Sequence, residues 1–332
     1  MRRELSPDSQ LSRAIPWAIV AALCCLVQPG MAQSLPLLHP VNPVAESRSG
    51  LYFQPTVPAG HGWRVAVGLD YGSMVELGLR YSLADTSYLL DAETLRLNLS
   101  LSRNLGPRSF VLAEVWGGGS YGGFLDGFLN WYHGVFGISF PERELRPKGE
   151  FAYRYKFADN RVVSFRAQSA YLGDLRLGLG RRVGRGVQSV LSVTLPTHTG
   201  GAGYGRGVPS LSLLNTARAQ VTPRLVLEGS GNIGWTPRHG ALRDVQEELF
   251  VLGTAGFRWR TIGPVWSFAN LYLHSPSYSG TQAGQLDNWD LTVDFGGIIR
   301  SAGGREFRFG VTEDLQPGGP AIDTNFRLGV SW

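Results

Sequence analysis

Apolar and polar residues alternate with a period of two along most of the chain from Trp63 onward. Every second residue from Trp63 to Tyr71 is apolar, and the residues between them are polar or small. The run from Leu95 to Leu101 repeats this alternation. Strict alternation predicts β-strands that have one apolar and one polar face. Similar runs recur at residues 75–81, 151–157, 187–195, 225–235, 249–259, 289–299 and 307–311.

The connections between these runs alternate between short and long. The short ones fall at residues 104–108, 158–160, 182–186, 222–224, 262–264 and 301–304, and the long ones at 118–149, 197–208, 237–246, 276–287 and 315–321. Outer-membrane barrels have short periplasmic turns and longer extracellular loops. The sequence therefore predicts an all-β fold, a transmembrane antiparallel β-barrel. We expect an even number of strands, about fourteen within a range of about twelve to sixteen, because residues 162–183 can form two strands or one bent strand.

The last alternating run carries Phe326, Leu328, Val330 and Trp332. We expect these four side chains to face lipid and the residues between them to face the lumen. An even strand count places this run beside the first one, so that it closes the barrel against residues 63–81. An aromatic closing strand is the signal that the barrel assembly machinery reads, and this machinery is therefore an expected partner.

The composition favours a membrane barrel over a soluble β-protein. Charged residues make up 17% of the 332 residues, and there are 44 glycines, whereas soluble domains carry about a quarter charged residues. A soluble sandwich or propeller would also alternate, but no cyclic repeat of about 40–50 residues is visible. The net charge of +5 is scattered along the chain, which argues against nucleic acid as a partner.

The first 32 residues have the features of a secretion signal. Arginines begin the segment, and residues 14–27 form an apolar run that is too short to span a bilayer comfortably as a helix. We expect cleavage after Ala32, where small residues form a cleavage site. An uncleaved anchor is the alternative, although no stop-transfer pattern follows. Both cysteines fall in this segment, so a cleaved chain would have no disulfide and no thiolate metal site.

Two further segments complete the expected organisation. Residues 33–61 are rich in proline, and we expect them to form a periplasmic lead-in that folds back against the mouth of the barrel. Residues 62–332 are expected to form the barrel itself, in the bacterial outer membrane.

The connection at residues 117–150 has a different periodicity from the rest of the chain. Apolar side chains recur there at spacings of three and four, which predicts a short amphipathic helix in the second extracellular loop. This helix could cap the barrel by burying its own apolar face, or it could fold inward and narrow a channel or line an apolar ligand site. Its apolar face comprises Leu125, Phe128, Leu129, Tyr132 and Phe136.

Charged residues on the polar face of the predicted strands are expected to line the lumen, because an Arg or Lys that faces lipid at mid-bilayer costs roughly 2–4 kcal/mol. Two interpretations stay open. The charges could pair with one another and fill the lumen, or they could line a basic pore for anionic solutes. The candidates are Arg64, Asp70, Glu76, Arg80, Arg96, Glu114, Arg154 and Lys156.

Three functions are compatible with such a barrel: a channel or binding barrel for small solutes, a structural or surface-exposed barrel without transport, and a lipid hydrolase. The channel is the leading hypothesis. For the hydrolase, His274 and Ser275 are adjacent in a predicted strand, so they point to opposite faces and cannot meet directly. This weak signal leads us to expect no catalytic residue and no cofactor. The histidines show no metal-ligand spacing, so we expect no metal. The expected partners are outer-membrane lipid, the assembly machinery and a small solute.

Four groups of residues form further recognisable motifs: 123–128 with His133 and 136–137, 171–175, 195–197, and 312–315 with 319–323. In these motifs the chain resembles an uncharacterised proteobacterial family of outer-membrane proteins, a domain of unknown function thought to form β-barrels. The resemblance covers about residues 42–332 and implies location and architecture, but no activity and no catalytic residues.

Overall fold

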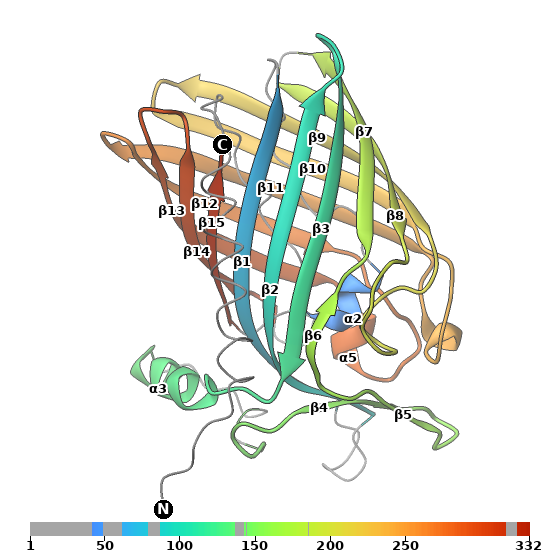
Figure 1. Cartoon of the computed structure of the whole chain (residues 1–332). Coiled ribbons are helices and arrows are strands. Elements are labelled where there is room, and N and C mark those ends of the chain that lie inside the picture. The colour runs from blue at the N-terminus through green and yellow to red at the C-terminus, as the bar shows by residue number, and fades with distance from the viewer. Residues whose placement is uncertain are drawn as a thin grey trace, which may run out of the picture.

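Twelve antiparallel strands close into a barrel in the computed structural model of the chain (Figure 1). The structure describes residues 42–48, 62–78, 87–136, 143, 145–184, 186–316 and 324–332. Each strand of the ring is hydrogen-bonded to the next. The ring consists of β1 (Trp63–Gly78), β2 (Tyr88–Asn104), β3 (Ser109–Tyr121), β7 (Leu175–Gly184), β8 (Val187–Leu195), β9 (Ser210–Thr222), β10 (Leu225–Trp235), β11 (Leu249–Ile262), β12 (Val265–His274), β13 (Asp290–Arg300), β14 (Glu306–Asp314) and β15 (Thr324–Ser331).

Strand β15 closes the ring by pairing with β1, which confirms the predicted closure. Leu69 lies opposite Leu328, and Tyr71 lies opposite Phe326. Val65 and Trp332 exchange two backbone hydrogen bonds of 3.1 Å each, so the pairing reaches the last residue. The prediction that Trp332 faces lipid is wrong, because its side chain is only 5% exposed. Protein covers the indole, and burial of so large a side chain stabilises the closure.

Three further strands lie outside the ring, at the ends of β2 and β3. β4 (Ala152–Lys156) pairs with the start of β2, β5 (Val162–Ser164) pairs with β4, and β6 (Gln168–Leu172) pairs with the end of β3. The estimate of about fourteen wall strands counted this region as wall, and the observed twelve lie within the predicted range. β1 and β2 have 16 and 17 residues, more than the roughly 9–11 that a tilted strand needs to cross a bilayer. Both strands therefore extend past the wall, and the end of β2 carries β4.

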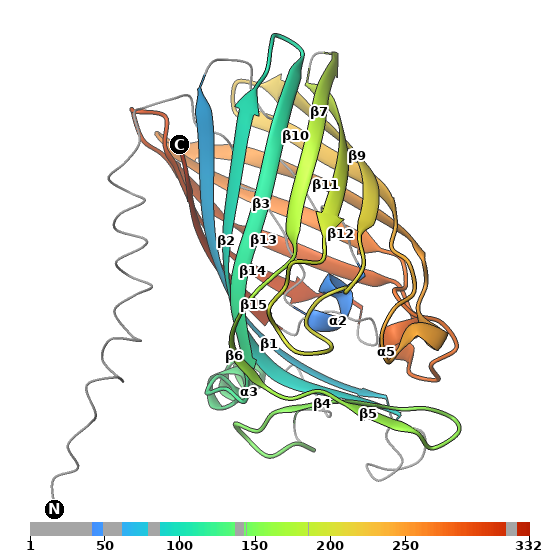
Figure 2. The same ribbon diagram turned by 45° about the vertical axis from the view of Figure 1, so that its right-hand side comes forward.

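The two ends of the barrel differ in their connections (Figure 2). Short turns join β2 to β3, β7 to β8, β9 to β10, β11 to β12 and β13 to β14 at one end, which we call the turn end. The opposite loop end carries α3 (Asp126–Phe136), the short helix η2 (Arg243–Val245) and α5 (Gly284–Asp287). Among the described residues, no helix is both long and apolar enough to cross a membrane.

The two faces of the wall follow the predicted alternation. Along β9, Ser212, Leu214 and Thr216 are buried, whereas Leu211 and Leu213 are exposed. In a barrel of this width the buried face is the lumen, and the exposed apolar face suits lipid. Large exposed apolar side chains recur around the ring, among them Leu179, Leu191, Ile233, Val251, Leu273 and Phe309.

An apolar core fills the loop end of the barrel. Aromatic side chains from the wall and from the outside strands meet there, and the ring of Trp116 packs edge-on against Tyr171 with centroids 5.4 Å apart. Burial of this apolar surface holds the loops over the barrel. The core comprises Val44, Met74, Tyr88, Leu90, Ala92, Trp116, Tyr153, Tyr155, Phe157, Tyr171, Tyr204, Leu242, Tyr278, Ala283 and Leu286.

Candidate functional site

A short segment that precedes the barrel in sequence lies inside its lumen. This lumen segment, residues 42–48, contains α2 (Pro43–Glu46) and is buried throughout. Asn42 begins the helix: its side chain accepts a hydrogen bond from the Val44 amide at 2.9 Å, which is the usual way to satisfy a free helical N–H. The Asn42 amide nitrogen also donates to Glu76 on β1 at 2.7 Å. In Figure 2 the blue α2 lies within the ring, toward the loop end.

Glu46 fixes the lumen segment to two walls of the barrel. Its carboxylate lies 3.0 Å from the Arg96 guanidinium on β2 and 2.5 Å from that of Arg176 on β7. Arg176 also pairs with Glu114 on β3 at 3.2 Å. All of these side chains are almost completely buried. Removing one partner from such a buried group costs about 3–5 kcal/mol, since a charge is left uncompensated.

Two arginines tie the end of the lumen segment to the loops. Arg48 donates to the carbonyl oxygens of Thr236, Pro237 and Glu247. Arg206, in the loop after β8, donates to the carbonyl oxygen of Glu46 at 3.1 Å. Burial lowers the pKa of Arg206 to about 10, so its guanidinium stays charged at neutral pH.

The structure places part of the predicted lead-in inside the lumen. Residues 42–48 lie in the lumen toward the loop end, while the remainder of residues 33–61 lies outside the described residues. The physical reason is electrostatic, because Glu46 supplies negative charge to two arginines that the wall buries.

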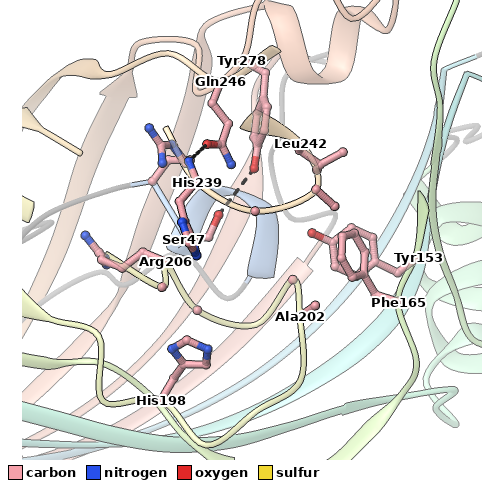
Figure 3. Close-up of a pocket in the computed structure, with 16 residues that line it drawn as sticks. Ser47, Tyr153, Phe165, His198, Ala202, Arg206, His239, Leu242, Gln246 and Tyr278 are labelled. Atoms are coloured by element: carbon pink, nitrogen blue, oxygen red, sulfur yellow. Dashed lines mark hydrogen bonds between the residues drawn. The ribbon is translucent and has the colours of Figure 1, made fainter. Parts of the chain in front are cut away.

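A cavity of about 150 Å³ lies on the loop side of the lumen segment (Figure 3). Ser47 and Arg48 line it on one side, and the hydroxyl of Ser47 lies 3.5 Å from that of Tyr278. Aromatic rings and cationic or imidazole side chains surround the space together, a lining that suits a small polar solute with an apolar body. The other labelled lining residues are Tyr153, Phe165, His198, Ala202, Arg206, His239, Leu242 and Gln246.

A network of ion pairs crosses the middle of the lumen. Arg327 on β15 lies 2.6 Å from Asp70 on β1 and 3.5 Å from Asp294 on β13. Arg308 on β14 lies 2.7 Å from Asp294. The lumen therefore holds mutually paired charges at mid-height, as the first of the two interpretations expects.

A second cavity, of about 450 Å³, lies at the turn end. Arg218, Arg260 and Arg300 line it from β9, β11 and β13. The guanidinium of Arg300 lies 4.6 Å from the ring centroid of Trp266 and 2.6 Å from a carboxylate oxygen of Glu306.

Further arginines lie on lumen-facing positions toward the turn end, namely Arg64, Arg182 and Arg258, and Arg258 pairs with Glu228 and Glu306. Cations outnumber anions among the described lumen-facing residues of this end. The resulting turn-end mouth is basic.

Five of the eight predicted lumen residues are buried on the lumen face: Arg64, Asp70, Glu76, Arg96 and Glu114. Arg80 lies outside the described residues. The prediction for Arg154 is wrong, because its side chain is exposed, and Lys156 is half-buried. The reason is that β4 lies outside the ring, where Tyr153 and Tyr155 take the buried face and join the loop-end core.

The sequence predicted the helix α3 but not its position. Leu125 and Leu129 are buried as expected, whereas Phe128 is exposed and Tyr132 is half-buried. Figure 1 shows α3 outside the ring at the loop end. The helix therefore neither caps the barrel nor narrows the lumen, and both expectations for it are wrong. The side chain of Phe136 lies outside the described part of the chain.

Sequence reasoning missed Glu46, Arg176 and Asp294. Arg176 alternates with Leu175 and Leu177, so the periodicity of β7 could have placed it in the lumen. Glu46 carried no such signal, since it lies in a proline-rich segment without a strand period.

His274 and Ser275, the residues weighed for a lipid hydrolase, make contacts that stabilise the fold. His274 is buried and stacks on Phe250 with centroids 6.0 Å apart. The hydroxyl of Ser275 accepts a hydrogen bond from the Val251 amide at 3.0 Å. Within the described residues, no group of three or more His, Cys, Asp or Glu side chains is placed to hold a metal ion.

Comparison with solved structures shows the fold of outer-membrane channels. The COG4313 outer membrane channel from Pseudomonas putida F1 has 12% identity and a TM-score of 0.53, over 82% of this chain and 96% of that chain. The NanC porin has 8% identity and a TM-score of 0.45, over 82% and 99%. The toluene transporter TodX from Pseudomonas putida has 11% identity and a TM-score of 0.39, over 90% and 95%. The likeness to the first of these structures shows a shared barrel fold.

No curated protein matches the chain in sequence. Residues 75–332, by contrast, match a protein family along most of the chain. The match confirms the resemblance to an uncharacterised barrel family, and the chain belongs to the family described as "Protein of unknown function (DUF3187)".

Proposed function

We propose that the protein is an outer-membrane channel for small solutes, closed in this state by the lumen segment. The observation that carries the proposal is the position of residues 42–48 between a cavity at the loop end and a cavity at the turn end. Ion pairs and hydrogen bonds hold the segment there. Such contacts can be exchanged for contacts with water or with a solute when the segment moves, so the closure is reversible.

The basic turn-end mouth favours small anions among the solutes. Arg218, Arg260 and Arg300 meet around one cavity, and rings of arginine side chains attract anions in pores. The loop-end cavity also presents Arg48 and Arg206 beside aromatic rings. A small organic anion with an apolar body suits both ends of the lumen.

Conductance across planar lipid bilayers tests the channel. The purified barrel is compared with Glu46→Gln, in which the amide cannot balance the charges of Arg96 and Arg176. We expect brief, rare openings for the unchanged chain and at least about a tenfold higher open probability for Glu46→Gln, since a loss of about 1.4 kcal/mol in closure is tenfold in the equilibrium.

Asp244→Asn serves as the matched control, because that carboxylate is more than half exposed and pairs with Arg161 outside the lumen. It should behave like the unchanged chain. If folded Glu46→Gln protein shows no current and liposomes that contain it do not swell in small solutes, the channel proposal is wrong and a structural barrel takes its place.

A further inference from the structure

We propose that α3 lies in the outer leaflet of the membrane and binds lipid with its exposed apolar face. This inference rests on the proposed location of the barrel in the outer membrane. The partner of this apolar face is the lipid beside the wall, with its acyl chains and head groups. Three independent features of α3 support it: its attachment, its exposed side chains and its height on the wall.

Polar contacts attach α3 to the outside of the barrel. Glu93 lies on the outer face of β2, where Leu95 and Leu97 face outward as well, yet its side chain is only 2% exposed. Its carboxylate accepts hydrogen bonds from the Leu125 amide at 2.6 Å and from the hydroxyl of Tyr71. The segment before α3 thus covers a charge that would otherwise face the membrane, where a charged side chain is unfavourable.

Gly123 permits this close attachment. A Cβ atom at this position would lie 1.6 Å from the carboxyl carbon of Glu93, so any larger residue would displace that carboxylate or the chain. Asp126 at the start of α3 pairs with Arg143 at 2.7 Å, and Arg143 donates to Ser73 on the outer face of β1 at 3.1 Å. The helix is therefore fixed to the wall and is not a loose loop.

Besides these polar contacts, α3 and the residue before it present exposed apolar side chains. Just before the helix, Phe124 is 77% exposed, and within it Trp131 is 64% exposed. Phe128 and Val135 are exposed too, whereas Leu129 is fully buried against the protein. Large aromatic side chains on one side of a short helix are typical of helices that lie in the membrane interface.

The height of α3 on the wall matches the edge of the lipid-facing band. Phe124 stacks on Tyr71 with centroids 5.6 Å apart, and Phe128 lies 6.2 Å from Phe326. Tyr71 pairs with Leu95 in the sheet, and Leu95 is exposed on the outer face. Glu93 lies two residues further toward the loop end, about 7 Å along the strand. The apolar face of α3 therefore continues the apolar surface of the wall at its outer margin.

Site-directed fluorescence in lipid vesicles tests the proposal. Cys24 and Cys25 are the only cysteines of the chain, so replacing both with serine allows a single label elsewhere. The full-length protein carries an environment-sensitive fluorophore on Trp131→Cys. It is reconstituted into phosphatidylcholine vesicles whose acyl chains bear bromine or nitroxide quenchers near the head group. Leu273→Cys on the exposed wall face is the lipid control, and Arg243→Cys on the exposed η2 is the water control.

We expect the label at residue 131 to be quenched to at least half the extent seen at residue 273, with a blue-shifted emission. Quenching at residue 131 no greater than at residue 243, while residue 273 is quenched, would overturn the inference and leave the membrane location intact. If residue 273 itself is not quenched in correctly folded protein, the barrel does not lie in the bilayer, and the proposed function fails together with the inference.

Discussion

At the scale of single residues, the lumen depends on close contacts between aromatic side chains and glycines. A Cβ atom at Gly180 on β7 would lie 2.1 Å from the ring of Phe110 on β3. Phe110 is fully buried and belongs to an apolar cluster with Leu112, Val190 and Leu214. The glycine therefore gives the ring room to lie across the lumen face of the neighbouring strand.

Gly180→Ala should destabilise the barrel by about 1–3 kcal/mol, since the added methyl group overpacks a filled site. The measurement is the urea midpoint of unfolding in detergent, followed by tryptophan fluorescence. Gly253→Ala on β11 is the control, because no atom lies within 4 Å of the place that its added methyl group would take, in the middle of an ordinary strand. Equal midpoints for the two variants would show that Phe110 does not need the space.

The charged residues of the lumen show the same dependence on partners. Asp70 alone would be a buried anion, but Arg327 and Asn98 satisfy it at 2.6 and 2.7 Å. Alternation along β1 was enough to predict that Asp70 faces inward. Its partners come from β15 and β2, and the pairing register of the closed ring decides which side chains they are.

At the scale of elements, the barrel is closed by β15 and by Trp332, the residue that follows it. The strand pairs with β1 on one side and with β14 on the other. Trp332 extends this pairing through Val65 and buries its indole. The role of Phe326, Leu328, Val330 and Trp332 as an assembly signal stays a prediction.

Removal of Trp332 should lower the yield of assembled barrel in the outer membrane several-fold, because two backbone hydrogen bonds and a buried aromatic side chain are lost at the seam. The assembled fraction is measured by the heat-dependent shift in gel mobility of membrane extracts. Leu328→Val, which keeps an apolar residue on the exposed face, should assemble normally. An unchanged yield without Trp332 would contradict a role in closure.

The lumen segment and α3 illustrate two different limits of sequence reasoning about elements. Apolar side chains at spacings of three and four predicted α3. The helix packs against the outer face of the wall, and no local pattern in the sequence identifies that partner. The lumen segment has a short helix that begins at Asn42-Pro43, a common start of a helix. Only the arginines of β2 and β7 explain why it lies inside the barrel.

At the scale of the whole molecule, charge is distributed unevenly along the lumen. Paired charges fill its middle, while the turn-end mouth carries an excess of arginine. A solute that passes the lumen would meet this mouth at one end and the aromatic cavity at the other. The distribution gives the proposed channel a preference for anions.

The reversal potential in a gradient of potassium chloride measures this preference. In the Glu46→Gln background, in which we expect more frequent openings, the current should be carried mainly by chloride. Arg218→Gln should shift the reversal potential toward zero, because it removes a cation from the lining of the mouth. Arg243→Gln, on an exposed loop helix outside the lumen, should leave it unchanged. A cation-selective current would contradict the preference for anions.

The sequence by itself determined the class of fold, the direction of the wall side chains and the closing pair of strands. The first two follow from a period of two, which residues such as Leu69 and Leu328 display without knowledge of their neighbours. The closing pair follows from an even number of strands. The tertiary structure decided the number of wall strands, the partners of Asp70 and Glu46, and the position of α3 on the outer face of the wall. These depend on contacts between residues far apart in the chain, such as Glu46 with Arg176, and local periodicity carries no information about such pairs.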